Sequence, residues 1–181
     1  MYTILIVEFM KIRLSVLLLF LSIVSFGQKK DIQVHNTKEY FIEYPKSWSL
    51  ELSENPSVEF ILKTKEQKTD PFRENITLVI QDLKEKDMPL EQYIELTESQ
   101  LRNMMKGSAV VENVYDKIRK RHVLVYSVNV SSAYLKVKQH FYKKGTQVYI
   151  LTFTALKKSY DDHKRIANTV LNSFMFKPER K

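Results

Sequence analysis

Residues 75–81 read Asn75-Ile-Thr-Leu-Val-Ile-Gln81 and place apolar side chains on nearly both faces of an extended chain. A strand with one face in water alternates apolar and polar residues, whereas a strand covered on both faces does not. The segment from Val148 to Phe153 has the same character. The sequence therefore predicts a sheet whose central strands are covered on both sides.

Two amphipathic segments can provide that cover. The first begins near Pro89 and ends before Gly107, with apolar residues recurring at helical spacing. Its expected buried stripe comprises Leu90, Tyr93, Ile94, Thr97, Leu101, Met104 and Met105. The second begins after Ser159, a residue type that caps helices through its hydroxyl. Its expected inward face comprises Ile166, Ala167, Val170, Leu171 and Phe174.

Shorter apolar runs predict the remaining strands. We expect strands 39–44 and 48–52 to form a β-hairpin, because the second alternates strictly and Pro45 opens the turn between them. Residues 28–38 lack periodicity and are expected to be a lead-in to the domain. The other expected strands are 58–62, 109–116, 121–130, 134–142 and 147–155, the last four forming an antiparallel meander. Gly145 supplies the positive φ that the last tight turn of this meander needs.

The resulting order is a β-rich segment, a helix, a β-meander and a second helix. Since the central strands are apolar on both faces, one helix on each side of a single sheet is the simplest packing. The sequence thus predicts an α+β fold: an α/β/α sandwich with a mainly antiparallel central sheet and one helix on each face. No internal repeat or long linker divides the chain, so residues 28–181 are expected to form one domain.

The N-terminus has the pattern of an export signal. A basic segment is followed by the apolar run Leu14 to Val24 and by small residues at Ser25 and Gly27, as signal peptidase requires. We expect residues 1–27 to be a signal peptide that is cleaved from the chain, with Met10 as the true start. The apolar run is too short to span a bilayer. The processed protein is therefore expected in the periplasm or outside the cell, and not as an integral membrane protein.

Composition excludes several kinds of chemistry. The 181-residue chain has no cysteine, three glycines and a net charge of +8. Disulfides, thiolate metal sites and thiol catalysis are therefore excluded, and glycine-rich phosphate-binding loops are not expected. The charge is uneven along the chain. Residues 28–116 carry a net charge of −5, whereas residues 117–181 contain 15 basic and 3 acidic residues, a net charge of +12.

Four motifs follow one another along the chain: Tyr40-Phe-Ile-Glu-Tyr-Pro-Lys-Ser-Trp48, Phe72-Arg-Glu-Asn-Ile76, Leu90-Glu-Gln-Tyr93 and Val170-Leu-Asn-Ser-Phe174. Together they resemble the bacterial PsbP-like family, within the PsbP/DcrB group of exported α/β/α sandwich domains. The resemblance implies this fold and a non-enzymatic accessory role, and it transfers no active site, because the group has no shared catalytic motif. The family often carries Asn-Gly in the turn before its longest central strand, where this chain has Arg119-Lys120-Arg121.

The densest basic run lies at that same turn. Its four cationic residues are Lys117, Arg119, Lys120 and Arg121. We take them as a candidate patch for binding an anionic surface or partner. A solvated strand surface without a binding role is the open alternative.

Residues typical of catalysis or metal binding do not form a recognisable motif. The histidines His35, His122, His140 and His163 are scattered along the chain. Asp161-Asp162-His163 has metal-ligating side chains, but acids in the first turn of a helix equally stabilise the helix dipole. Glu43 and Glu51 are expected on the outer faces of the first hairpin. We therefore expect no enzyme, no catalytic, cofactor-binding or metal site and no cofactor.

These observations predict an exported, non-catalytic accessory or interaction protein whose partner is an envelope protein or an anionic surface. Tyrosines and lysines interleave in the meander, as in some nucleic-acid-binding sheets, but an exported protein seldom meets nucleic acid, so no nucleic acid is expected. Two alternatives stay open. A small-molecule or metal-binding periplasmic carrier would need a concave apolar pocket, and a hydrolase would need a nucleophile and a base brought together from distant segments.

Overall fold

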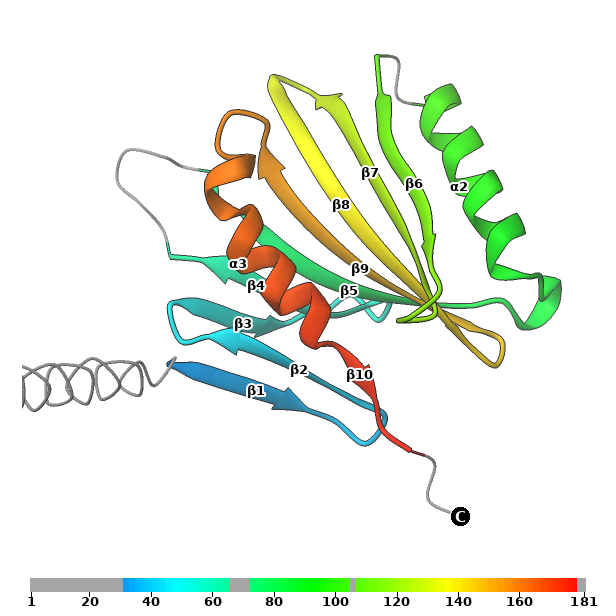
Figure 1. Ribbon diagram of the computed structural model, residues 1–181, viewed down its shortest axis with the longest axis horizontal. Helices are drawn as coiled ribbons and strands as arrows, with labels where there is room; N and C mark the ends of the chain where they lie inside the picture. The colour runs from blue at the N-terminus through cyan, green and yellow to red at the C-terminus, as the bar shows by residue number, and fades with distance from the viewer. Residues whose placement is uncertain (1–30, 66–71, 105–106, 179–181) are drawn as a thin grey trace, which may run out of the picture. The chain divides into compact units, whose positions relative to one another are not determined.

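The structure is a computed structural model that describes residues 31–65, 72–104 and 107–178. Every described helix and strand belongs to one compact unit that begins at Ile32 (Figure 1). The predicted signal peptide, residues 1–27, lies outside the described residues.

A seven-stranded sheet forms the centre of this unit, and all its strand pairs are antiparallel. In spatial order the strands are β3 (Trp48–Leu52), β4 (Val58–Thr64), β5 (Asn75–Asp82), β9 (Gln147–Leu156), β8 (Ala133–Lys144), β7 (Arg121–Val130) and β6 (Ala109–Asp116). The predicted meander is confirmed, because β6 to β9 pair in sequence order. The turn between β8 and β9 contains Gly145 with φ +58°, as its tight geometry requires.

The two central strands are apolar on both faces because each contributes to two cores. In β9, Leu151 and Phe153 face one core, while Val148 faces the other and Ile150 packs against it half-buried. Leu78 of β5 pairs with Leu151 and is completely buried. Alternate side chains of a strand point to opposite faces, so the apolar runs at residues 75–81 and 148–153 reflect cover on both sides.

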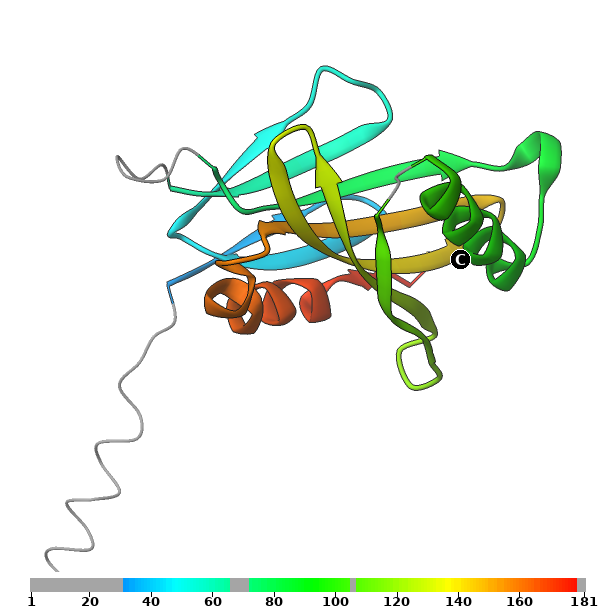
Figure 2. The same ribbon diagram turned by 90° about the horizontal axis from the view of Figure 1, so that it is seen from above.

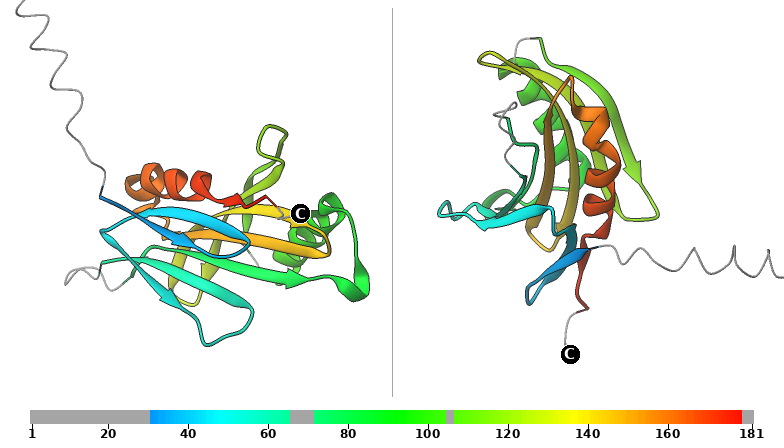
Figure 3. Two further views of the ribbon diagram at one scale, coloured as in Figure 1. Left: turned by 90° about the horizontal axis from the view of Figure 1, so that it is seen from below. Right: turned by 90° about the vertical axis from the view of Figure 1, so that its left-hand side faces the viewer.

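The two helices provide that cover from opposite faces. α2 (Leu90–Met104) contacts β7 and β8, and α3 (Tyr160–Ser173) contacts β9 and the separate strand β2 (Tyr40–Pro45). The right-hand view of Figure 3 shows α2 and α3 on either side of the strands. The α+β fold, an α/β/α sandwich around a mainly antiparallel sheet, is therefore confirmed. Within the described residues, neither helix is long and apolar enough to cross a membrane.

The predicted hairpin of residues 39–44 and 48–52 is wrong. β2 pairs instead with β1 (Ile32–Asn36) and β10 (Met175–Phe176) in a second, three-stranded sheet, whereas β3 pairs with β4. The predicted lead-in thus contains a strand. β1 escaped notice because it is largely exposed, with Val34 54% accessible, so burial imposes no alternation on it. The expectation of a single sheet is corrected accordingly.

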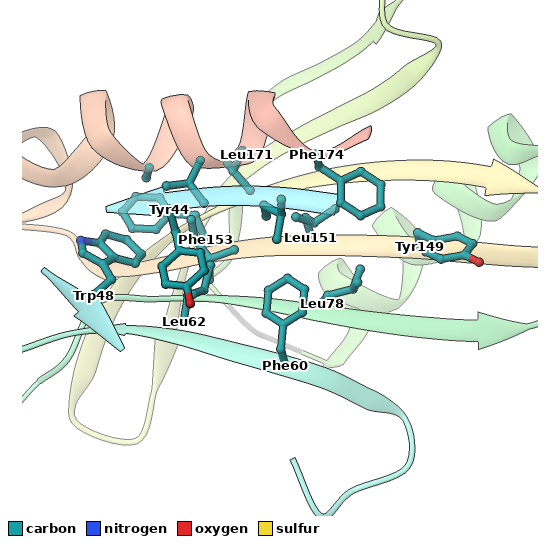
Figure 4. Packing of buried hydrophobic residues seen from close by; sticks show 14 of the residues in the cluster. Tyr44, Trp48, Phe60, Leu62, Leu78, Tyr149, Leu151, Phe153, Leu171 and Phe174 are labelled. Atoms are coloured by element: carbon teal, nitrogen blue, oxygen red, sulfur yellow. The ribbon is translucent and has the colours of Figure 1, made fainter. Parts of the chain in front are cut away.

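The larger core lies between α3, β2 and the central sheet. Figure 4 shows Leu171 and Phe174 pointing from the end of α3 toward Leu151, and Tyr44 of the small sheet near Trp48 in the same cluster. The predicted inward face of α3 is confirmed except at Ile166, which is half-exposed at the margin of the stripe. The other four members are buried: Ala167, Val170, Leu171 and Phe174.

The smaller core lies under α2. It contains Leu90 and Ile94 of the helix, packed with Leu124, Phe141 and Val148 of the sheet. Of the predicted α2 stripe, Leu90, Ile94 and Leu101 are buried, and Tyr93 and Thr97 are half-buried. The side chains at Met104 and Met105 lie outside the described part of the chain.

Candidate interaction site on the β6–β7 hairpin

The predicted basic run lies in the turn that joins β6 to β7. We call residues 117–120 the hairpin tip. All four residues are exposed, and the side chain of Ile118 is 90% accessible. The hairpin extends beyond the sheet on the side that α3 covers (Figures 2 and 3). The tip therefore presents Lys117, Arg119 and Lys120 around one exposed aliphatic residue.

Asp116 organises the turn from its base. Its Oδ1 accepts a hydrogen bond from the backbone N–H of Arg119 at 3.1 Å, and its Oδ2 lies 3.7 Å from Nη1 of the same residue. The backbone N–H of Arg119, with the guanidinium groups of Arg121 and Arg119, holds the pKa of the Asp116 carboxyl below its usual range. Lys120 has φ +48°, the left-handed conformation that glycine adopts at less cost. The turn is thus held by a carboxylate in place of the Asn-Gly that the resemblance implied.

Arg121, the fourth residue of the predicted patch, points away from the surface. It is only 6% exposed, its Nε donates to Asp116 Oδ2 at 3.2 Å, and its Nη1 lies 2.8 Å from Nδ1 of His140. The same Nη1 donates to the hydroxyl of Tyr142 at 3.3 Å. The structure therefore places Lys117, Arg119 and Lys120 together in the tip and Arg121 beneath them.

The imidazole of His140 is neutral, and it can therefore accept a hydrogen bond from the buried guanidinium of Arg121. Burial lowers its pKa from 6.5 to about 3, and the positive charges of Arg121 and Lys138 act in the same direction. Since an arginine only donates, Nδ1 of His140 must accept, which we assign as the tautomer with its proton on Nε2. Nε2 has no hydrogen-bond partner among the described residues, although the ring lies close to the backbone of Leu171 in α3. This buried pair fixes the base of the hairpin, and its imidazole stays neutral at neutral pH because its pKa is lowered.

His122 belongs to a second polar network, on the opposite face of the sheet. Its Nε2 contacts Oδ1 of Asn113, whose Nδ2 donates to Glu98 Oε2 at 2.9 Å, and Glu98 is ion-paired with Arg102. The network links α2 to β6 and β7 and thereby steadies the outer strands. Nothing in the sequence signals it, because Glu98 and Asn113 become neighbours only when the helix packs on the sheet.

The hydrolase alternative can be compared with the closest Ser–His–acid grouping that the structure shows. Ser159 donates its hydroxyl to Oε1 of Glu74 at 2.6 Å, and His163 Nε2 lies 3.7 Å from Glu74 Oε2. His163 Nδ1 faces the backbone carbonyl of Ser159 at 3.1 Å and not its hydroxyl. The imidazole is therefore not placed to take the serine proton. The expected hydroxyl cap of α3 is wrong as well, since the Ser159 hydroxyl binds Glu74 and makes no capping bond.

The other acidic candidates are also apart. Glu43 lies in β2 and Glu51 in β3, so they belong to different sheets, and Glu51 is ion-paired with Lys63 at 2.5 Å. Asp161 and Asp162 occupy the first turn of α3. In the described ranges, no group of three or more His, Asp or Glu side chains is arranged to hold a metal ion.

A hollow beside the turn between β1 and β2 bears on the carrier alternative. It encloses about 970 Å³ and is lined by Asn36, Thr37, Lys38, Glu39, Lys144, Lys177 and Pro178. A carrier pocket is mostly apolar with a few convergent polar groups. This hollow is lined mainly by polar and charged side chains, so its chemistry does not favour an apolar ligand.

Comparison with known proteins identifies the fold. No family model matches the chain, and no curated protein matches its sequence. Among solved structures, cyanobacterial PsbP (CyanoP) from Synechocystis sp. PCC 6803 superposes with a TM-score of 0.59 at 14% identity, covering 84% of this chain and 96% of that chain. The protein of unknown function PA94 from Pseudomonas aeruginosa gives 0.57 at 18% identity, with 82% and 99% covered.

LpqN, involved in cell envelope biogenesis of Mycobacterium tuberculosis, gives a TM-score of 0.56 at 12% identity, covering 84% of this chain and 88% of that chain. The sequence identities are low, yet the alignments span nearly the whole length of each of these three structures. Together with the antiparallel sheet between α2 and α3, they show that this chain has the PsbP-like fold.

Proposed function

We propose that this protein is an exported, non-catalytic interaction protein that binds an anionic envelope component through the hairpin tip. The observation that carries the proposal is the arrangement of three exposed cations, Lys117, Arg119 and Lys120, on a turn whose base is held by the ion pair of half-buried Asp116 with buried Arg121. A binding loop held in one conformation loses less entropy when its partner arrives.

The charge of the tip is available to a partner. Lys117 and Lys120 have no ion-pair partner in the described residues, and Arg119 only approaches Asp116 at 3.7 Å while it is half-exposed. The buried guanidinium of Arg121, by contrast, forms an ion pair with Asp116 and neutralises its charge. Each cation near an anionic surface contributes roughly 1 kcal/mol. Three cations therefore give the tip an affinity that depends strongly on salt concentration.

The place of action is the periplasm or the exterior of the cell. The signal-peptide pattern at residues 1–27 supports export. The fold shared with LpqN, which is involved in cell envelope biogenesis, agrees with a role in the envelope. Mass spectrometry of the protein recovered from the envelope fraction should find an N-terminus at Gln28. A chain that retains Leu14 to Val24 would contradict export by cleavage.

The absence of catalysis is part of the proposal. Its support is that the Ser159–Glu74–His163 geometry provides no relay from serine to histidine and that His140 is sealed beneath α3. A screen of the processed protein against ester, phosphoester and glycoside substrates should give no turnover. Activity that disappears in the variant Ser159→Ala would overturn this part.

The test of the tip uses charge reversal at positions without structural partners. Lys117→Glu combined with Lys120→Glu changes the net charge by four units and leaves the buried pair intact. The matched control is Lys158→Glu with Arg165→Glu, which makes the same change at exposed positions outside the tip. Capture of envelope proteins, anionic polysaccharide or anionic lipid at low salt should fall at least about fivefold for the tip variant relative to the control. Equal capture by both variants would overturn the proposed role of the tip.

A further inference from the structure

The centre of the hairpin tip is apolar. Ile118 is the most exposed of the large apolar side chains in the described residues, at 90%, and it lies between Lys117 and Arg119. It belongs to the turn and not to either strand, so it contributes nothing to the sheet or to either core. A fully exposed isoleucine at the end of a projecting turn has no explanation in the packing of the fold.

The surroundings of Ile118 distinguish between kinds of partner. Val114 and Tyr115 are the nearest exposed apolar residues of β6, and as sequence neighbours in a strand they point to opposite faces. The apolar surface therefore does not widen into the contiguous patch that a protein partner would cover. It is one convex aliphatic residue surrounded by three cations.

That arrangement fits the interface of an anionic membrane. An aliphatic side chain gains by leaving water for the acyl boundary, while lysine and arginine keep their charges at the level of the lipid phosphates. The tip would meet the bilayer in a fixed conformation, because Asp116 holds the backbone of Arg119 and the side chain of Arg121.

We propose that the hairpin tip docks on an anionic lipid bilayer by inserting Ile118 below the headgroups, with Lys117, Arg119 and Lys120 on the lipid phosphates. This inference rests on the proposed anion-binding role of the tip. It adds that the partner is a lipid bilayer and that Ile118 reaches below the headgroups. It makes the protein peripheral to the membrane through a folded loop, independently of residues 1–27.

The natural absence of cysteine allows a direct measurement of insertion. The variant Ile118→Cys, labelled with an environment-sensitive fluorophore, reports the polarity at the tip. Leu52→Cys, at an exposed apolar position on the edge strand β3, is the matched control. On phosphatidylcholine vesicles containing phosphatidylglycerol, the label at position 118 should shift to the blue and gain intensity, whereas the label at position 52 should not change. Vesicles of phosphatidylcholine alone should leave both labels unchanged.

Binding of unlabelled variants to the same vesicles separates charge from insertion. Ile118→Ser should lower the partition coefficient about tenfold, because the apolar contribution is lost while the charge is kept. Lys117→Glu with Lys120→Glu should lower it further, and the control Lys158→Glu with Arg165→Glu should lower it much less. All variants are compared as the processed chain that begins at Gln28, so a difference between a tip variant and the control reports the tip.

The outcomes are distinguishable. A blue shift at position 118 together with weaker binding of Ile118→Ser supports insertion. If charge reversal weakens vesicle binding but the label at 118 does not shift and Ile118→Ser binds normally, insertion is overturned and the anion-binding tip stands. If wild type binds no anionic vesicles but captures an envelope protein through the tip, the lipid partner is overturned. If the tip and control charge-reversal variants bind vesicles and envelope components equally well, both the insertion and the proposed function are overturned.

Discussion

Nη1 of Arg121 lies 2.8 Å from Nδ1 of His140, and both side chains are almost completely buried beneath α3. The pair joins the first residue of β7 to a residue near the end of β8, and it continues through Arg121 Nε to Asp116 at the end of β6. Three neighbouring strands are therefore tied together directly below the hairpin tip. This network holds the base of an exposed turn that contains no glycine.

Replacement of Arg121 should be strongly destabilising. Arg121→Met removes the hydrogen bonds of the buried guanidinium to Asp116, His140 and Tyr142, so the free energy of unfolding should fall by about 2 kcal/mol. The control Arg119→Met removes a half-exposed guanidinium and should cost about 0.5 kcal/mol or less. Urea unfolding measures both. Equal losses for the two variants would show that the buried network does not support the hairpin.

The neutral state of His140 should make stability depend on pH. Its folded pKa of about 3 lies below its ordinary value of 6.5, so the unfolded chain binds a proton that the folded chain does not. The stabilisation is complete above pH 6.5 and is lost as the pH falls toward 3, by about 1.4 kcal/mol per pH unit. Between pH 7 and 4.5, the decrease in the free energy of unfolding should be about 2 to 3 kcal/mol smaller for His140→Gln than for wild type.

Urea unfolding at several pH values measures this difference, and the carboxylates common to both proteins cancel in the comparison. Proton NMR of the His140 ring provides a second measurement that does not depend on the stability of the variant. The ring should remain unprotonated at about pH 5. Parallel pH profiles for wild type and His140→Gln would contradict the prediction.

Replacing Lys120 with glycine should stabilise the protein. A side chain at φ +48° meets a steric cost that glycine avoids, so Lys120→Gly should raise the free energy of unfolding by about 1 kcal/mol. Gly145→Ala makes the opposite change at φ +58° and should lower it by a similar amount. Thermal unfolding of both variants checks the sign of each effect. A neutral or destabilising Lys120→Gly would mean that the turn relaxes when the lysine is absent.

The bond between Ser159 and Glu74 should be structural. Glu74 is buried and its Oε1 accepts the serine hydroxyl at 2.6 Å, joining the start of α3 to the segment before β5. Ser159→Ala should cost about 2 kcal/mol, because a hydrogen bond to a charged group is lost. A double-mutant cycle with Glu74→Gln should show coupling of about 1 kcal/mol. The His163 ring lies 3.7 Å from the carboxylate of Glu74, so His163→Gln should lower the free energy of unfolding by less than Ser159→Ala.

The sequence predicted the layers of the fold well because buried faces of helices and strands require apolar residues at regular spacings. The apolar runs at residues 75–81 and 148–153 indicated cover on both faces, and the stripes of α2 and α3 indicated the helices that provide it. The pairing of β2 could not be read in this way. Tyr44 and Trp48 do share one core, but their strands belong to different sheets, because the partner β1 is exposed and carries no alternation.

The candidate site was predicted in part. The basic turn at residues 117–120 stands out as a run of charge next to a strand, and the structure exposes it. The burial of Arg121 could not be inferred, since β7 is covered on both faces over its first five residues and its sequence shows no polar side. Which charged residue turns inward depends on Asp116 and His140, which lie five and nineteen residues away along the chain.

Local sequence was enough to establish the α+β sandwich, the meander and a basic segment at its first hairpin, because periodicity, turn residues and charge runs are properties of neighbouring residues. Only the tertiary structure decided that β2 leaves the main sheet, that Arg121 pairs with His140 beneath α3, and that Ile118 is left alone at the end of the turn. These features depend on strand register and on packing between distant segments, where the energies of desolvation and pairing are set by neighbours that the linear order does not specify.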